Sequence, residues 1–181
     1  MQTEQIHKIK EEIAAFGLPE YQSIPNVGLF LEQTVKYVND FLPPLGLPLI
    51  TNSMVSNYVK KKIIPNPVKK QYDREQIARV LFIALAKSVL SLEDIQTLLQ
   101  VQEGKCSLPA AYEIFCQEMQ DSLRRVFALE EVSGAGHEES EAFSESMSER
   151  ELMHNITVTL AHKIYMDKYI KAYRACDRNN K

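Results

Sequence analysis

The apolar residues of the N-terminal part of the chain recur at helical spacing. Residues 3–16 carry isoleucines at i, i+3 and i+7 and end before a glycine, and residues 29–42 repeat this spacing with leucines and valines. Two prolines within residues 18–27 predict an extended connector between the two helices, and the prolines of residues 43–48 interrupt the chain after the second. We expect one helix and its connector over residues 1–24.

Residues 51–101 alternate between short helices and one hairpin. The first expected element is a helix that is capped by Thr51 or Ser53 and ends near residue 62. A wing follows, with arms 63–65 and 69–72 joined by Asn66 and Pro67. Two helices come next: one over residues 74–89, capped by Asp73, and one that begins with Ser91 and Asp94 and ends at residue 99. The two arms are too short for a sheet of their own and fit a thin hairpin. Short helices around such a hairpin predict a mostly α fold with a winged helix-turn-helix core over residues 25–101.

A longer apolar stripe follows in residues 108–129, where Pro109 stands at a first-turn position. The stripe repeats every three or four residues through Leu108, Tyr112, Phe115, Met119, Ser122, Val126 and Leu129. This heptad register is long enough to pair with another helix. We therefore predict a C-terminal helical extension over residues 102–181, with a dimer interface at the last helix, at this stripe, or at both, the stripe contributing Leu108, Tyr112, Phe115, Met119 and Val126.

The last helix is expected from about residue 149 to residue 176, after an acidic segment. Residues 130–149 are rich in serine and glutamate and poor in large apolar residues, which predicts a loop. Tyr165, Tyr169 and Tyr173 form a stripe on the last helix that could line a ligand pocket. Helical spacing of this kind more often indicates packing.

Charge is distributed unevenly along a chain whose net charge is −3. Residues 51–87 contain eight lysines and arginines and two acidic residues, whereas residues 129–151 contain eight glutamates and one arginine. A local excess of positive charge in an acidic protein favours one face that binds a polyanion. The alternative is that Lys60, Lys61 and Lys62 only solvate a helix end and interact with its dipole.

Composition sets the class of protein. A hydrophobic fraction of 45% and a charged fraction of 25% are ordinary for a folded soluble domain. The N-terminus lacks an apolar signal region, and the longest apolar run, residues 80–90, is about half a membrane span. Cys106, Cys116 and Cys176 are odd in number and widely spaced, which favours a reducing cytoplasm over a disulfide framework. We expect a cytoplasmic protein with no membrane partner.

Metal-binding and catalytic motifs are missing from the sequence. The cysteines form no C-x-x-C pair and no Cys/His cluster, so buried free thiols are the favoured interpretation. Glu151 and His154 stand at i and i+3, as in half of a helix-bundle metal site, but no second pair accompanies them and a surface ion pair is favoured. No phosphate-binding glycine loop, G-x-S-x-G or H-E-x-x-H occurs. We expect that the protein binds no cofactor and that it is not an enzyme.

The helix before the hairpin carries residue types that read DNA. In the major groove, Asn can bond adenine at two atoms, and Lys can reach guanine or phosphate. The residues expected to face the groove are Ser53, Ser56, Asn57 and Lys60. Those expected to hold the flanking phosphates, and so to fix the register of the complex, are Lys61, Lys62, Lys69, Lys70 and Tyr72. With about four to six phosphate contacts, affinity would fall steeply with salt, by roughly 0.9 per contact on a log–log plot.

Residues 55–65, which read VSNYVKKKIIP, resemble without a gap the pattern around the recognition helix of MerR-type regulators, typically L-R-Y-Y-E-K-K-G-L-I-P. The wing of that family usually ends G-Y-R-x-Y, and residues 68–72 read VKKQY. Residues 91–99, SLEDIQTLL, are similar to the family's s-L-e-e-I-k-e-l-L. The resemblance covers residues 51–99, and the positions that match directly are Tyr58, Lys60, Lys61, Pro65 and Tyr72. It adds Tyr58 to the expected DNA contacts.

Several positions depart from the MerR-type pattern. Ser56 and Asn57 replace the usual Arg and Tyr, Lys62 replaces a Gly, and the wing also lacks its Gly. Residues 24–99 are more similar to an uncharacterised MerR-like family of Gram-positive bacteria, known as a domain of unknown function. That similarity implies the same fold and a bacterial origin, and it brings no known ligand or reaction.

We therefore expect a sequence-specific transcription regulator of MerR-like type that binds double-stranded DNA. A homodimer is expected because one small recognition helix rarely supplies enough specificity and pairing doubles the site. The sequence names no effector, whether a small molecule or a protein. The alternative, which the replaced Arg and Gly positions keep open, is a helical protein-interaction module that retains the winged-helix fold without DNA binding.

Overall fold

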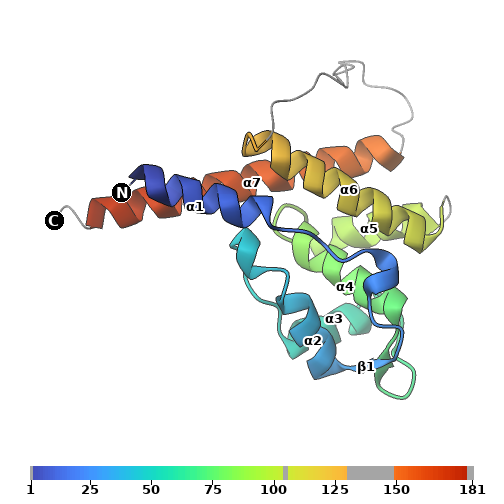
Figure 1. Cartoon of the computed structure of the whole chain (residues 1–181). Coiled ribbons are helices and arrows are strands. Elements are labelled where there is room, and N and C mark those ends of the chain that lie inside the picture. Colours follow the sequence, from blue (N-terminus) through green and yellow to red (C-terminus); the bar gives the residue numbers. More distant parts are fainter. Residues whose placement is uncertain (1, 104–105, 130–148, 179–181) are drawn as a thin grey trace.

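The computed structural model describes residues 2–103, 106–129 and 149–178, and it is mostly helical (Figure 1). Its elements in chain order are α1 (Gln2–Ala14), η1 (Tyr21–Ser23), β1 (Leu29–Phe30), α2 (Leu31–Asn39), η2 (Pro43–Leu45), α3 (Asn52–Lys60), β2 (Gln71–Tyr72), α4 (Arg74–Ala86), α5 (Leu92–Glu103), α6 (Leu108–Val126) and α7 (Glu149–Arg178). The described residues thus contain seven α-helices, and β1 and β2 form one antiparallel sheet. The prediction of a mostly α fold with a small β element is confirmed.

The helices form two layers that share one core. Helices α6 and α7 lie side by side in one layer, and α1 runs along the far part of α7, where Lys168 Nζ lies 3.2 Å from Glu12 Oε2 (Figure 1). Helices α2 to α5 and the sheet make the second layer. Helix α4 packs against α2, α5, α6 and α7 and so connects the layers. The buried apolar residues form one cluster that includes residues from both sides of position 101.

Helix α4 is central because its sequence is apolar on nearly every side. Each residue from Gln76 to Ala86 is buried. At the N-terminus of the helix, Asp73 Oδ1 accepts a hydrogen bond from Gln76 N at 2.8 Å, and Gln76 Oε1 accepts one from Asp73 N at 2.9 Å, which is a reciprocal cap. Gln76 Nε2 also donates to Pro65 O at 2.8 Å. These bonds attach the segment that follows α3 to the start of α4.

The sheet pairs different strands from those that the sequence predicts. Tyr72 of β2 lies opposite Leu29 of β1, and Gln71 lies opposite Phe30. On its other side, Gln71 forms an isolated bridge with Val68 across a tight turn. We call residues 68–71 the basic hairpin. The partner of β2 therefore comes from the N-terminal segment, and the predicted pairing of residues 63–65 with residues 69–72 is wrong.

The predicted first arm, residues 63–65, belongs instead to the end of α3. Ile63 and Ile64 are buried, and the N–H groups of both donate to Tyr58 O, at 3.0 and 3.4 Å. Pro65 has no N–H to give. Because the backbone donors of this segment are used locally or absent, it cannot form a ladder with β2.

The apolar stripe of α6 faces the interior of its own chain. Phe115 is 1% exposed, and its ring meets the ring of Phe82 on α4 edge to face, with centroids 5.0 Å apart. Tyr112 is also buried, and its hydroxyl donates to Pro19 O at 3.0 Å. Met119 is fully buried, and Leu108 and Val126 are half-buried against the same core. These contacts correct the predicted dimer interface, because they use Leu108, Tyr112, Phe115, Met119 and Val126 within one chain.

The tyrosine stripe of α7 also serves packing. Tyr165 and Tyr169 stack with ring centroids 4.3 Å apart, and Tyr165 meets the ring of Phe127 at 5.2 Å. The side chain of Tyr173 and residues 130–148 of the predicted acidic loop, 130–149, lie outside the described part of the structure. None of the described helices combines the length and the apolar character that a membrane span requires.

Candidate nucleic-acid interface

Helix α3 presents a continuous polar face to solvent. Thr51 caps the helix, since its hydroxyl accepts a hydrogen bond from Met54 N at 3.3 Å. Val55 and Tyr58 are buried on one side, with Met54 and Val59 half-buried beside them. The opposite arc is polar, exposed except for half-buried Asn57, and consists of Asn52, Ser53, Ser56, Asn57 and Lys60. This arc contains all four residues that the sequence predicts to face a major groove.

Two hydrogen bonds fix the segment that leads into α3. Asn39 of α2 donates from Nδ2 to Ile50 O at 3.0 Å and accepts at Oδ1 from Ile50 N at 2.9 Å. Ile50 is buried, and α2 packs directly against α3. The direction of the polar face is therefore set by the core and not by a free loop.

Lys62, two residues after the last residue of α3, has the left-handed backbone conformation, with φ of 58°. Lys62 N donates to Val59 O at 2.9 Å, and Ile63 N donates to Tyr58 O at 3.0 Å. This pair of bonds is the Schellman arrangement of a helix C-terminus, in which glycine usually occupies the left-handed position because it has no Cβ to clash. Lysine occupies this position, although glycine would adopt the same conformation with less backbone strain.

Two more lysines form the turn of the basic hairpin. Gln71 N donates to Val68 O at 2.9 Å, and the two residues between them, Lys69 and Lys70, have φ of 51° and 66°. Positive φ at both central residues defines a type I′ turn, which Asn-Gly or Gly-Gly usually forms. Both lysines are exposed, so the turn carries two positive charges at its tip.

The strained backbone positions concentrate at this surface. Among the described residues, four that are not glycine have positive φ, and three of them are Lys62, Lys69 and Lys70. Each left-handed residue of this kind costs on the order of 1 kcal/mol or more, and glycine would avoid that cost. Backbone strain is characteristic of functional sites. The three lysines therefore mark this surface as the candidate site.

Only part of the predicted positive charge remains available to a partner. Arg74 is engaged within the chain, since its Nε donates to Ile24 O at 2.9 Å and its Nη1 to Gln22 Oε1 at 2.7 Å. Arg79 is buried, and Lys87 is half-buried, which lowers the pKa of its ammonium group. The exposed cations of this stretch are Lys60, Lys61, Lys62, Lys69 and Lys70.

Two predicted DNA contacts lie in the core. Tyr58 is 2% exposed and Tyr72 is 4% exposed, and burial raises the pKa of both hydroxyl groups. The Tyr58 hydroxyl is buried without a hydrogen-bond partner among the described residues. The prediction that these two rings contact DNA is corrected, because they support α3 and the sheet from the inside.

The five exposed lysines lie at one end of the molecule. Residues 62 and 69 are joined by a short segment, so their Cα atoms lie at most about 25 Å apart, the length of about seven base pairs. Figure 1 shows the loop after α3 and the hairpin at the end of the second layer that is remote from α6 and α7. Residues 19–115, just over half of the chain, match the family described as Domain of unknown function (DUF1836).

The chain belongs to this family. No curated protein and no solved structure matches the chain. The DUF1836 segment includes the sheet, the polar face of α3 and all five exposed lysines, and it ends within α6.

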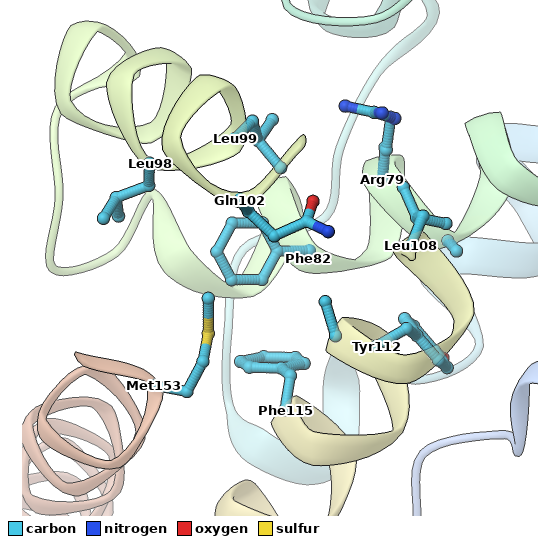
Figure 2. Close-up of a pocket in the computed structure, with 11 residues that line it drawn as sticks. Arg79, Phe82, Leu98, Leu99, Gln102, Leu108, Tyr112, Phe115 and Met153 are labelled. Atoms are coloured by element: carbon cyan, nitrogen blue, oxygen red, sulfur yellow. The ribbon is translucent and has the colours of Figure 1, made fainter. Parts of the chain in front are cut away.

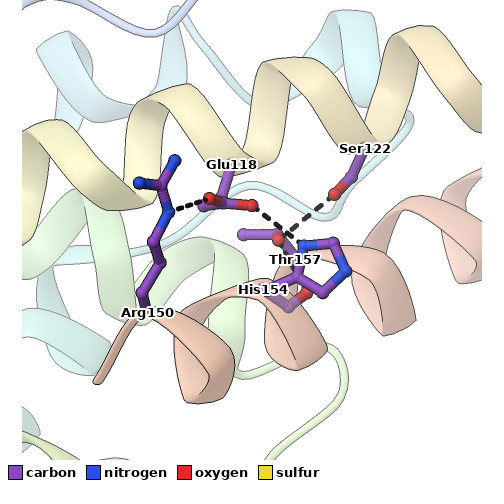
Figure 3. A network of polar contacts seen from close by, with 5 residues as sticks. All are labelled: Glu118, Ser122, Arg150, His154 and Thr157. Carbon is purple, nitrogen blue, oxygen red and sulfur yellow. Dashed lines mark hydrogen bonds and ion pairs between the residues drawn. The ribbon is translucent and has the colours of Figure 1, made fainter. Parts of the chain in front are cut away.

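A second polar cluster lies beyond the DUF1836 segment, between α6 and α7 (Figure 3). Glu118 is 4% exposed, its Oε1 accepts from Arg150 Nε at 3.1 Å, and its Oε2 lies 2.9 Å from His154 Nδ1. Burial by itself raises the pKa of Glu118, but the hydrogen bonds and charges of His154 and Arg150 outweigh burial and lower this pKa. One turn further along, Ser122 Oγ donates to Thr157 Oγ1 at 3.2 Å. The cluster joins the two helices.

The structure bears on two predictions made from the sequence, for His154 and for the cysteines. His154, predicted to form a surface pair with Glu151, reaches a buried carboxylate on another helix. Within the described residues, no group of three or more His, Cys, Asp or Glu side chains could hold a metal ion. Cys106 and Cys116 form no disulfide, and burial raises the pKa of the Cys116 thiol to about 12. A thiol of this kind is protonated and unreactive at neutral pH, in line with the predicted structural role.

An apolar hollow lies where the DUF1836 segment meets α7 (Figure 2). Its free space is about 420 Å³ when the open side is included, and its lining residues come from α4, α5, α6 and α7, among them Phe82, Leu98, Leu99, Phe115 and Met153. Arg79 and Gln102 supply its polar groups, and Gln102 Nε2 donates to Cys106 O at 2.9 Å. Only about 30 Å³ of this space can be occupied by the centre of a water-sized sphere, which is room for about two water molecules, and the lining offers no acid–base pair for catalysis.

Proposed function

We propose that the protein is a DNA-binding transcription regulator of MerR-like type, in which β1, α2, α3, the basic hairpin and α4 act as a winged helix-turn-helix. The order strand, helix, helix, hairpin, helix supports this assignment, together with the resemblance of residues 51–99 to MerR-type regulators. The observation that carries the proposal is the set of left-handed lysines, Lys62, Lys69 and Lys70, beside the polar face of α3. At these positions the chain keeps a positive charge although glycine would stabilise the backbone.

In the proposed complex, the polar face of α3 enters the major groove. Asn57 is suited to an adenine, and Lys60 reaches a guanine or a phosphate, while Ser53 and Ser56 accept or donate single hydrogen bonds. Lys61 and Lys62 hold phosphates on one side of the groove. The lysines of the basic hairpin hold phosphates on the other side, and these contacts position the helix without reading the sequence.

We further propose that the protein binds DNA as a dimer. Because the stripe of α6 is used inside the chain, the last helix is the remaining one of the two predicted surfaces. On α7, Met166 and Ile170 are 54% and 42% exposed and stand one turn apart on a common face. Light scattering should give twice the 20.7 kDa mass of the chain, and a monomer at micromolar concentration would contradict this part of the proposal.

DNA binding is tested by the salt dependence of affinity for a duplex of mixed sequence. Each phosphate contact contributes roughly 0.9 to the slope of log affinity against log salt. Replacing Lys60, Lys61, Lys69 and Lys70 together by Gln should reduce the slope by about 3 to 4 and abolish measurable binding at physiological salt. The measurement is fluorescence anisotropy of a labelled duplex at several salt concentrations.

A matched control removes the same charge from the other end of the molecule. Lys8 on α1, Arg125 on α6, and Lys171 and Arg174 on α7 are all exposed, and their replacement by Gln changes the net charge equally. This variant should keep most of the affinity. If the wild-type protein binds no duplex at low salt, the function proposed here is wrong. The capture of one stable protein partner by such a protein would then favour the interaction-module alternative.

A further inference from the structure

The outer face of the small sheet carries apolar side chains that point away from the core. Directly opposed residues of an antiparallel pair lie on the same face of a sheet, and successive residues alternate between faces. Leu29 and Tyr72 form one opposed pair, and they are half-buried and buried. The next row consists of Phe30, Gln71 and Val68, because Gln71 lies opposite Phe30 on one side and Val68 on the other.

This row is unusually exposed for apolar residues. Phe30 is 52% exposed and Val68 is 73% exposed, with half-buried Gln71 between them. The chain beside the row is held close to the sheet, since a Cβ added to Gly28 would lie 2.7 Å from Gln71 Cβ. We call Phe30 and Val68 the apolar row. Both residues lie in the segment that the family match covers.

Positive charge flanks the apolar row, and this charge narrows the choice of partner. Lys69 follows Val68 directly, and Lys70 precedes Gln71, so two exposed ammonium groups stand at the tip of the same hairpin. Two copies of the chain that met through this row would bring like charges together, which is unfavourable. The nearby carboxylate of Asp73 caps α4 and is thereby engaged.

Duplex DNA matches both features of this surface. Its minor groove offers sugar rings and base edges between two lines of phosphate, and proteins that bind there combine Lys or Arg with apolar wedges such as Phe. A wedge that unstacks a base step bends the duplex, and pyrimidine–purine steps such as TA bend most readily. The apolar row therefore suits a flexible base step, and its contact with that step requires no hydrogen bond to a base.

We propose that Phe30 and Val68 enter the minor groove of the bound duplex and bend it, while Lys69 and Lys70 hold the adjacent phosphates. This inference rests on the proposed DNA binding and adds a second element to it. The polar face of α3 reads bases in the major groove. The apolar row reads the deformability of the neighbouring step.

The test replaces both apolar residues by Ser, in a variant with Phe30→Ser and Val68→Ser. The probe is a duplex of about 30 base pairs with a central TA step and a dye at each end, so that energy transfer reports bending and anisotropy reports affinity. Affinity should fall by roughly ten- to fifty-fold, as expected for uncovering about 50 to 90 Å² of apolar surface. Bending should be lost, and the salt slope should stay unchanged because no phosphate contact is removed.

Two further variants keep the result interpretable. Val101 on α5 is an exposed apolar residue outside the proposed DNA and dimer surfaces, and Val101→Ser should leave affinity and bending unchanged. Phe30→Leu keeps an apolar side chain at the sheet and should retain most of the bending, even if the double Ser variant proves unstable in a thermal melt.

The outcomes separate this inference from the proposed function. Wild-type protein that binds the duplex, with equal affinity and bending in the double Ser variant, would overturn the wedge and leave DNA binding intact. Wild-type protein that binds no duplex would overturn both. A double Ser variant whose mass in light scattering halves, with bending unchanged, would identify the row as a protein contact and also overturn the inference.

Discussion

In the layer of α6 and α7, the charged side chain of Glu118 is buried and paired, whereas at α3 and the basic hairpin five lysines stay exposed and three of them occupy strained backbone. The first layer uses polar groups to join two helices. The second region keeps charge on the surface although a less costly residue is available. Stability explains the first arrangement, and the proposed contact with DNA would account for the second.

The same contrast holds for apolar residues. The heptad stripe of α6 has the spacing of an interface, yet Phe115 and Met119 are buried in the chain itself. The apolar row has no such spacing and remains exposed. Periodicity therefore indicates which face of a helix is covered, and the tertiary structure decides what covers it. Five single substitutions test this comparison, beginning with the largest expected effect.

Phe115→Ala should lower the free energy of unfolding by about 3–5 kcal/mol, because it removes a buried ring from the contact with Phe82 and leaves a cavity. The measurement is urea denaturation followed by circular dichroism. If the stripe is part of a monomer core, the loss should be the same at all protein concentrations. A loss that shrinks as the protein is concentrated would restore the dimer interpretation of α6.

Glu118→Gln should lower the free energy of unfolding at pH 7 by about 1–3 kcal/mol, because hydrogen bonds to a charged acceptor are replaced by neutral ones. The folded-state pKa of Glu118 is lowered, so its contribution is present above the unfolded-state pKa of about 4.3 and is lost as the pH falls through the folded-state pKa. The variant should therefore lose less stability than the wild type between pH 6 and acid.

The control for this pH dependence is Glu20→Gln, which neutralises an exposed carboxylate. It should leave both the stability at pH 7 and its fall in acid close to those of the wild type. An equal fall in the wild type and in the Glu118 variant would show that the α6–α7 cluster contributes nothing to acid sensitivity.

Lys62→Gly and Lys70→Gly should each raise the free energy of unfolding by about 1 kcal/mol, because glycine adopts the left-handed conformation without strain. Each should also weaken DNA binding and reduce the salt slope by about 0.9. Ala128, the fourth residue with positive φ, provides the control: Ala128→Gly should stabilise the protein without changing DNA binding. If the Lys62→Gly and Lys70→Gly variants are less stable than the wild type, the backbone at these positions is not strained by lysine.

Local signals in the sequence predicted much of the fold correctly. Thr51 and Asp73 cap α3 and α4 as expected, because a cap needs only the residues of the first turn. The partner of β2 was not predictable in this way, since β1 is two residues long and more than forty positions away. Lys62 shows a third case. The sequence shows that lysine replaces the glycine of the family pattern, and the structure shows that this lysine adopts the conformation that glycine would have.

The sequence predicted part of the candidate site. The predictions that failed concern aromatic rings that are buried in the structure. Sequence reasoning placed the polar arc of α3 and the five lysines on the surface, where the structure has them. It also assigned Tyr72 to a DNA phosphate, and the family pattern, which both tyrosines match, added Tyr58. Residues that match a pattern can do so for packing, and these two are buried. The sequence does not indicate Phe30 as a site residue. What identifies it is its pairing with Gln71, which exists only in the folded sheet.

Tyr58→Phe has the smallest expected effect and distinguishes a core tyrosine from a DNA contact. The hydroxyl is buried without a partner among the described residues, so its removal relieves a desolvation cost and should change the free energy of unfolding by no more than about 1 kcal/mol, in the stabilising direction. DNA affinity and the salt slope should equal those of the wild type, because α3 keeps its shape and its polar arc. A clear loss of affinity with unchanged stability would mean that the ring leaves the core when DNA binds. Tyr58 would then belong to the DNA-binding surface and not only to the core.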